Sequence, residues 1–223
     1  MKPKAIFFDV DGTIIPLKVV VRTFQETCKH FNIRVLTSKK ILDNTIGLKL
    51  TEAIPKVIPE ALPFEKEFIK YFEDHQVENF KKYGKLLPYV KITFKKIKNR
   101  KLKIGIVTTK KKREAIAILN GYSLPYDTVV GNDDVKNRKP DPEPVFKACE
   151  NLKIKPKDCI FVGDTPFDMQ AAKSAGCLAT GVLTGHENRK NLKKAGADYI
   201  IKNLKGLFKL LKQGDKIRKN YNS

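Results

Sequence analysis

Two carboxylates near the start of the chain are the first residues whose types and spacing suit catalysis. Asp9 and Asp11 stand in the segment Asp-Val-Asp-Gly-Thr, directly after the apolar run at residues 5–8. A carboxylate at the carboxyl end of a strand in an open α/β sheet lies in the crevice where ligands bind, and residues two apart can share one face. Gly12 then lets the chain turn sharply. Taken alone, this pattern is typical both of a plain turn and of a metal-binding loop.

Three later segments also place polar side chains where an apolar run ends. Thr108 and Thr109 follow Ile-Gly-Ile-Val, where they suit an anion ahead of a helix, although a simple helix cap explains them equally well. Lys139 stands in Asn-Arg-Lys-Pro-Asp-Pro, whose prolines stiffen the loop. Asp164 and Asp168 follow Phe-Val-Gly; capping of a helix explains Asp168 well and Asp164 less well. The joint occurrence of these segments in one order is much more specific than any one of them.

The elements that must hold these side chains alternate along most of the chain. Short apolar runs, typical of buried parallel strands, lie at residues 5–8, 104–107, 128–130, 159–162, 178–182 and 199–201. Helical patterns between them cover residues 111–119, 142–152, 166–175 and 187–194. Repeated strand–helix alternation predicts an α/β fold with a doubly wound parallel sheet that helices cover on both faces.

The stretch from residue 17 to residue 84 interrupts this alternation. It has no convincing strand, and its helical patterns lie at residues 19–31, 38–44, 52–58 and 64–83. Phe64, Phe68 and Phe72 repeat at helical spacing, which predicts one packed face rather than an aromatic binding site. We therefore expect a core domain at residues 1–16 and 85–223 and an inserted helical domain at residues 17–84.

The net charge is the most unusual feature of the composition. The 223 residues include 45 Lys and Arg against 24 Asp and Glu, a formal net charge of +21. This charge suggests nucleic acid, an anionic membrane surface or an anionic small substrate as the partner, without choosing among them. The four cysteines form no Cys-x-x-Cys pair, which favours reduced thiols in a core. No segment suits a signal peptide or a membrane span, so we expect a soluble, cytoplasmic protein.

A basic block carries much of this charge. Residues 81–113 hold fourteen Lys or Arg and no Asp or Glu. Nucleic-acid binding is the alternative function from another class, and it would depend steeply on salt. Lysine outnumbers arginine, however, and aromatic rings are not interleaved as base-stacking platforms. The block is therefore better explained as a solvated surface that also steers small dianions toward a carboxylate-lined site.

Together the four polar segments resemble the four sequence motifs of the haloacid dehalogenase (HAD) superfamily, and the likeness runs along the whole chain. The helical insert resembles the C1 cap of that superfamily. The segments Asp-Asp-Val-Lys-Asn-Arg-Lys-Pro-Asp-Pro-Glu-Pro and Gly-Asp-Thr-Pro-Phe-Asp-Met-Gln-Ala-Ala-Lys-Ser-Ala-Gly are similar to the phosphoglycolate phosphatase and pyrophosphatase branch. Because dehalogenases lack the second acid of the first motif, Asp11 favours phosphate-ester chemistry. The resemblance implies a HAD-like Rossmannoid core beneath a C1 cap.

The resemblance implies a role for each matching residue. Asp9 is the expected nucleophile, forming an aspartyl-phosphate that water hydrolyses, and Asp11 is the expected general acid and base. Asp9, the backbone carbonyl of Asp11 and Asp164 resemble the Mg²⁺ ligands of the family. Asp168 is expected to support these ligands or to orient Lys139, which would neutralise both the nucleophile and the transferring phosphoryl group.

Substrate binding is expected from the remaining matched residues. Thr108 and Thr109, with neighbouring backbone N–H groups, would hold phosphate oxygens. Gly-Leu-Lys-Leu at residues 47–50 resembles a substrate-facing cap loop, and its Lys49 would contact a substrate carboxylate unless it is a plain surface lysine. The expected function is Mg²⁺-dependent hydrolysis of a small phosphoester, phosphoglycolate first. Pyrophosphate hydrolysis and a sugar-phosphate phosphatase or mutase reaction are the alternatives, and the oligomeric state is left open.

Overall fold

The computed structural model describes residues 3–212 of the chain. The described residues form two compact units, a core unit of residues 3–15 and 86–212 and a helical unit of residues 16–85. The division expected from the sequence lies one residue away at each junction. That the helical unit acts as a cap stays a prediction.

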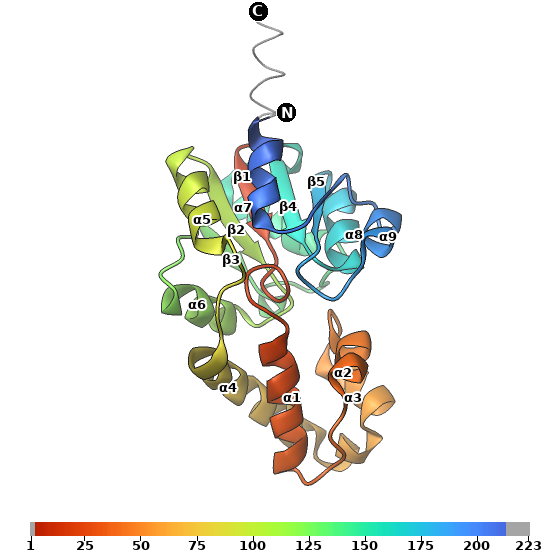
Figure 1. Cartoon of the computed structure of the whole chain (residues 1–223). Helices are drawn as coiled ribbons and strands as arrows, with labels where there is room; N and C mark the ends of the chain where they lie inside the picture. The colour runs from red at the N-terminus through yellow and green to blue at the C-terminus, as the bar shows by residue number, and fades with distance from the viewer. Residues whose placement is uncertain (1–2, 213–223) are drawn as a thin grey trace, which may run out of the picture. The chain divides into compact units, whose positions relative to one another are not determined.

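The core unit is built on a parallel sheet of six strands in the order β3-β2-β1-β4-β5-β6 (Figure 1). The strands are β1 (Ala5–Phe8), β2 (Lys103–Val107), β3 (Thr128–Val130), β4 (Cys159–Gly163), β5 (Leu178–Val182) and β6 (Tyr199–Ile201). All six predicted strands are therefore present. The central strand β1 pairs with β2 on one side and β4 on the other, and Phe8 lies level with Ile106 and Val162. The carboxyl ends of three strands thus meet at one edge, where the strand order reverses and α/β sheets bind ligands.

Helices cover both faces of this sheet. They are α5 (Val90–Asn99), α6 (Lys112–Gly121), α7 (Glu143–Leu152), α8 (Pro166–Ala175) and α9 (Arg189–Lys194). Phe7 packs in a core cluster with Val145 of α7 and Met169 of α8. The next residue, Phe8, stacks on Phe94 of α5 with ring centroids 5.0 Å apart. Because successive strand residues point to opposite faces, α5 lies on the other side of the sheet from α7 and α8. The predicted α/β class with a doubly wound parallel sheet is confirmed.

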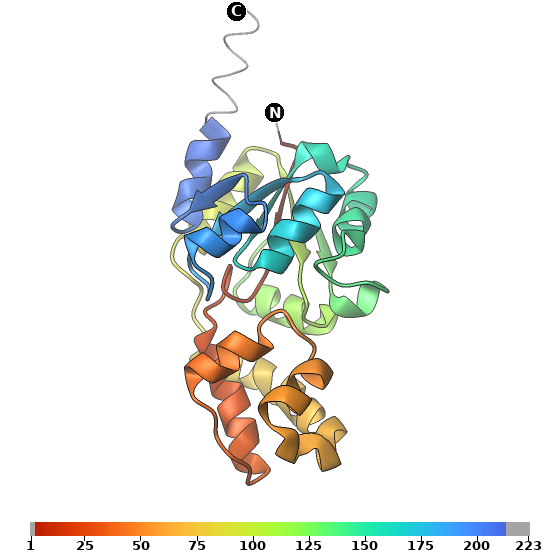
Figure 2. The ribbon, with the colours of Figure 1, turned by 90° about the vertical axis from the view of Figure 1, so that its right-hand side faces the viewer.

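The helical unit contains α1 (Lys18–His30), α2 (Ser38–Thr45), α3 (Leu50–Val57) and α4 (Glu65–Tyr83), with a short 3-10 helix at Pro59–Phe64. Figure 2 shows these helices in red to yellow. Its core is partly aromatic, since Phe24 of α1 makes edge contacts with Phe68 and Phe72 of α4 at centroid distances of 5.6 and 6.1 Å. The predicted packed face of Phe residues is therefore confirmed. In the part of the chain that the structure describes, every helix is too short or too polar to cross a bilayer.

The cysteines lie in the cores of the two units, as predicted, and none of the described ones forms a disulfide. Burial raises the pKa of the Cys28 thiol in α1 to about 11. The sulfur atoms of Cys149, Cys159 and Cys177 lie within 4.8 Å of one another in an apolar cluster of the core unit. This cluster is at the amino ends of β4 and β5, the edge of the sheet opposite the carboxylates.

Candidate active site

The turn after β1 places the first pair of carboxylates. The Asp9 N–H donates to the Val162 carbonyl at 3.0 Å, so Asp9 continues the strand ladder, and the chain then folds back with three N–H groups donating to the Val10 carbonyl. Gly12 has a φ of +73°, and a β-carbon there would collide with the Asp164 carboxylate. The tight turn therefore needs glycine for two reasons, and it holds Asp9 and Asp11 at the carboxyl edge of the sheet.

Lys139 reaches this turn from the loop that precedes α7. Its buried ammonium donates to Asp9 Oδ1 at 2.8 Å, to Asp168 Oδ1 at 2.6 Å and to the Val107 carbonyl at 3.2 Å. Burial works to lower the pKa of Lys139, but Asp168 and Asp9 outweigh it and hold the pKa above its usual value. The lysine is therefore a fixed positive charge between two carboxylates that lie 159 residues apart in sequence.

Asp164 and Asp168 come from the end of β4 and the first turn of α8. Thr165 caps α8: its hydroxyl accepts from the Asp168 N–H at 3.2 Å, and Asp168 Oδ2 accepts from both the N–H and the hydroxyl of Thr165. Both carboxylate oxygens of Asp168 are thus engaged. Asp164 Oδ1 accepts from the Thr13 hydroxyl at 3.1 Å, whereas Asp164 Oδ2 is buried without a partner among the described residues. Asp164 therefore has one carboxylate oxygen that is available to bind a ligand.

The loop after β2 carries the candidate phosphate-binding residues. Thr108 is buried, and its N–H donates to the Val130 carbonyl at 3.0 Å. Its hydroxyl accepts from the Lys110 N–H at 3.2 Å, so the hydroxyl proton is directed elsewhere. Thr109 follows in the same turn and is half-buried. The loop lies at the edge of the sheet where β1 ends, as the sequence predicts for these residues.

Lys49 is the candidate residue that belongs to the helical unit. It is exposed and precedes α3, where its carbonyl accepts from the N–H groups of Glu52 and Ala53, both at 3.0 Å. Its backbone therefore starts the helix, and its side chain is free of the core of its own unit. Contact between Lys49 and a substrate stays a prediction.

Three further residues complete the site, and sequence reasoning did not single them out. Thr13 binds Asp164, the Thr184 hydroxyl donates to the Gly12 carbonyl at 2.6 Å, and the Lys110 ammonium lies 2.9 Å from Asp11 Oδ2. Thr13 belongs to the Asp-Gly-Thr segment and Lys110 follows the two threonines, so both had a local signal. Thr184 had none, because its partner lies 172 residues away.

The charges of the site are unbalanced. Burial, followed by the charges of Asp168 and Asp9, raises the pKa of Asp164 well above its ordinary value. Burial also raises the pKa of Asp9 to about 7, although Lys139 acts in the opposite direction. Four carboxylates therefore face two buried ammonium groups, those of Lys139 and Lys110. A divalent cation would correct this imbalance.

The donor atoms fit a magnesium ion. Asp9, Asp164 and Asp168 each offer a carboxylate oxygen within 4.8 Å of the others. All are oxygen ligands, which Mg²⁺ prefers, and the partnerless Oδ2 of Asp164 is available to it. Asp168 is less suited to direct ligation, since Lys139 and Thr165 already occupy both of its oxygens. That Asp9 and Asp164 act as metal ligands, with Asp168 as their support, stays a prediction.

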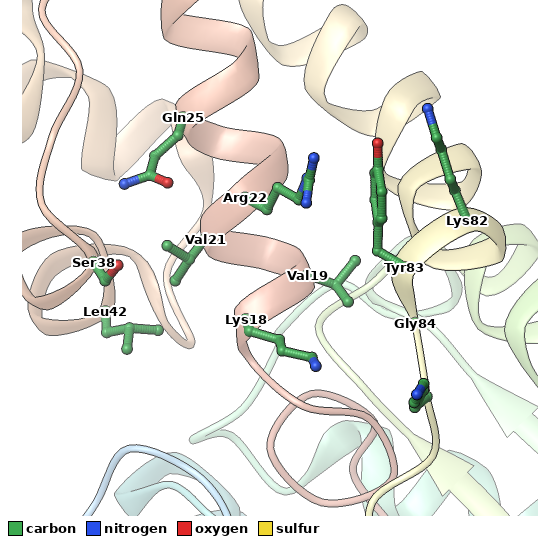
Figure 3. A pocket seen from close by; sticks show the side chains of 11 residues that line it. Lys18, Val19, Val21, Arg22, Gln25, Ser38, Leu42, Lys82, Tyr83 and Gly84 are labelled. Carbon is green, nitrogen blue, oxygen red and sulfur yellow. The ribbon is translucent and has the colours of Figure 1, made fainter.

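A separate cavity of about 750 Å³ lies within the helical unit, between α1, α2 and the end of α4. Four of its lining residues are basic, namely Lys18, Arg22, Lys82 and Lys85. Figure 3 shows Arg22 pointing toward Tyr83, and its guanidinium lies 3.5 Å from the centre of that ring. The described lining includes neither Lys49 nor any of the carboxylates above, so this cavity is distinct from the candidate active site.

Comparisons with known proteins agree with this geometry. The family model described as haloacid dehalogenase-like hydrolase matches residues 6–182. A pyrophosphatase PpaX from Bacillus velezensis is 31% identical, covering 92% of this chain and 94% of the relative. A phosphoglycolate phosphatase from Aquifex aeolicus is also 31% identical, covering 82% and 86%.

A solved structure extends the likeness to the fold. It is described as that of a predicted phosphoglycolate phosphatase from Haemophilus somnus, with a TM-score of 0.85 and 24% identity, covering 94% of this chain and 98% of that one. The sequence matches, the parallel sheet and the carboxylates at its edge all support the same family assignment. The chain is a member of the haloacid dehalogenase-like hydrolase family, and it is an enzyme.

Proposed function

We propose that this protein is a Mg²⁺-dependent phosphoester hydrolase that forms a phosphoryl-enzyme intermediate on Asp9. The observation that carries the proposal is the arrangement of Asp9, which is buried, paired with Lys139 at 2.8 Å and next to an acid with a spare oxygen. A carboxylate nucleophile splits the displacement at phosphorus into two easier steps. Phosphoryl transfer depends mainly on positioning and charge neutralisation, and this site supplies both.

Each side chain has a defined part in this reaction. Asp9 Oδ2 attacks phosphorus while Oδ1 stays bonded to Lys139, which keeps the nucleophile in place. The three N–H donors of Lys139 already serve Asp9, Asp168 and the Val107 carbonyl, so Lys139 acts on the phosphoryl group through its charge. Asp11 protonates the leaving oxygen and then takes a proton from the hydrolytic water. The Thr108 hydroxyl donates to a phosphate oxygen.

Asp9 and Asp164 would hold the metal ion, with the Asp11 backbone carbonyl. When bound, Mg²⁺ supplies positive charge that lets an anionic nucleophile approach an anionic phosphoryl group. Asp168 fixes the Lys139 ammonium beside these ligands at 2.6 Å. Its second oxygen is fixed by Thr165, so the helix start of α8 and the catalytic lysine form one rigid assembly.

The substrate we propose is a small phosphorylated metabolite, with phosphoglycolate as the first choice. The phosphoglycolate phosphatase of Aquifex aeolicus supports that choice. Inorganic pyrophosphate is the second candidate, and the relatives named pyrophosphatase PpaX favour it. Steady-state phosphate release over both compounds, a sugar phosphate and a nucleotide would decide between them, and a mutase would release little phosphate from any.

Replacement of the nucleophile tests the proposal. We expect Asp9→Asn to abolish phosphate release from p-nitrophenyl phosphate, because an amide cannot form the phosphoryl intermediate. Asp158→Asn is a matched control, since Asp158 pairs with Lys4 at the opposite end of β4 and should leave the activity unchanged. Undiminished turnover by Asp9→Asn, with a far-UV circular dichroism spectrum like that of the wild type, would refute the mechanism.

A further inference from the structure

Lys110 is a lysine of the basic block that turns inward. Its side chain is 5% exposed, whereas Lys95 and Lys96 on α5 are exposed to solvent. Its ammonium lies 2.9 Å from Asp11 Oδ2. Burying an ammonium is costly unless a carboxylate compensates it. Lys110 is therefore buried because it pairs with Asp11, and it is not one of the surface lysines that keep the protein soluble.

The backbone around Lys110 is held on both sides. Its N–H donates to the Thr108 hydroxyl at 3.2 Å, and its carbonyl accepts from the Asn132 N–H at 2.9 Å. The Thr108 N–H in turn donates to the Val130 carbonyl at 3.0 Å. The ends of β2 and β3 thus fix the point from which the Lys110 side chain reaches Asp11.

The two carboxylate oxygens of Asp11 have different surroundings. Oδ2 pairs with Lys110, while Oδ1 is buried and has no hydrogen-bond partner within the described chain. A carboxylate on a rotatable side chain exchanges its oxygens unless a neighbour holds one of them. Lys110 holds Oδ2, and this fixes the orientation of the Asp11 carboxyl group.

We propose that Lys110 is a positioning residue for Asp11: by holding Oδ2 it fixes the Asp11 carboxyl group in the orientation from which that group protonates the leaving-group oxygen of the substrate. The inference rests on the proposed function and adds to it a residue that acts through the acid–base group. In the transfer step, the bond from phosphorus to the leaving oxygen breaks, the bond to Asp9 forms, and the proton of the Asp11 carboxyl group moves to the leaving oxygen. Misplacing a reacting group by about 1 Å costs roughly 100-fold in rate.

Lys139 cannot take over this task. Its three N–H donors are already directed at Asp9, Asp168 and the Val107 carbonyl. Lys110 and Lys139 are the buried lysines of the described chain, and each serves a different acid of the first turn. One ammonium thus orients the nucleophile and the other orients the proton donor.

The test compares substrates that differ in their need for a proton. A p-nitrophenolate ion leaves without protonation, phenolate benefits from a proton, and the alkoxide of phosphoglycolate requires one. The quantity to measure is kcat/KM, because this ratio reports only the steps up to formation of the phosphoryl-enzyme. Hydrolysis of the phosphoryl-enzyme is common to all substrates and does not affect the ratio. We expect Lys110→Met to lower kcat/KM about 10- to 100-fold for the alkyl ester and by less than about 3-fold for p-nitrophenyl phosphate.

Three further variants make the outcome decisive. Lys110→Arg should recover much of the alkyl-ester activity because it keeps a cation beside Oδ2, and Asp11→Asn should show the same leaving-group pattern as Lys110→Met. Lys95→Met, at an exposed lysine of α5, should match the wild type. An equal loss on all substrates, or no loss on any, would overturn the proposal, and thermal melts would identify a folding defect in Lys110→Met. If the wild type hydrolyses none of the phosphoesters, it is the proposed function that fails.

Discussion

Replacing Asp164 by Asn should stabilise the metal-free protein and weaken the metal-bound one. Asp164 is buried with one oxygen bonded to Thr13 at 3.1 Å and the other without a partner in the described chain. In the variant, the amide oxygen can still accept from Thr13. The amide nitrogen then takes the place of Oδ2 and can donate to the neighbouring carboxylates of Asp9 and Asp168, which offer oxygens within 4.8 Å.

The size of the effect follows from these contacts. An unsatisfied buried polar group costs about 1–3 kcal/mol, so the variant should gain about that much stability without metal. For a chain of this size, about 1 kcal/mol corresponds to a shift of about 2–4 °C in Tm, which gives an increase of about 2–12 °C in EDTA. The wild type should instead gain about 2.7 kcal/mol, or about 5–11 °C, when Mg²⁺ is present at about 100 times its Kd.

Thermal melts with EDTA and with saturating MgCl₂ measure both effects. Because the pKa of Asp164 is raised on folding, the folded metal-free protein binds more protons than the unfolded chain above the ordinary pKa of an aspartate. Its stability should therefore fall as the pH rises from about 4, and Asp164→Asn should flatten that fall. If Asp164→Asn melts below the wild type in EDTA, or if Mg²⁺ raises the Tm of both proteins equally, the assignment of Asp164 is wrong.

Two other predictions concern Asp127 and Lys49. Burial favours a higher pKa for Asp127, but the Ile104 N–H and the ammonium groups of Lys98 and Lys103 outweigh it and lower the pKa. The stability that ionised Asp127 contributes is complete above about pH 4 and disappears as the pH falls through its lower native pKa. The Tm difference between wild type and Asp127→Asn should therefore shrink below about pH 4. A Tm difference that stays constant would contradict this. Lys49→Ala should raise KM for phosphoglycolate without changing KM for p-nitrophenyl phosphate, and an unchanged KM for both would leave Lys49 a surface lysine.

The strands and most of the candidate site were predictable because parallel strands end at one edge. Asp9, Thr108 and Asp164 each follow an apolar run, and the strand order places those ends side by side. The structure brings them together with Lys139 and Asp168. The numbers of residues that separate them in the sequence do not by themselves predict this proximity. The pattern of strand followed by polar residue is local, and it needs only the topology to become a site.

The features that sequence reasoning missed are those with weak local signals. Helix α5 was not predicted because its apolar stripe of Val90, Phe94 and Ile97 is short and interleaved with lysines. The exposed face of α5 carries lysines of the basic block. Much of the positive charge of that block therefore lies on a solvated helix surface. Lys110 stands in a run of lysines, so composition conceals it, and only its burial against Asp11 distinguishes it.

The contact between Thr184 and Gly12 has a consequence for biosynthesis. The Thr184 hydroxyl donates to the carbonyl of the turn that holds the proposed nucleophile, across 172 residues of chain. Lys139 and Asp164 reach the same turn across 130 and 151 residues, through Asp9 and Thr13. While the chain grows on a ribosome, Asp9 is among the first residues to emerge, but Lys139, the proposed metal ligand Asp164 and the turn-supporting Thr184 come much later. A nascent or truncated chain that stops before residue 184 therefore lacks part of the site, so completion of the fold itself controls when the chemistry can begin.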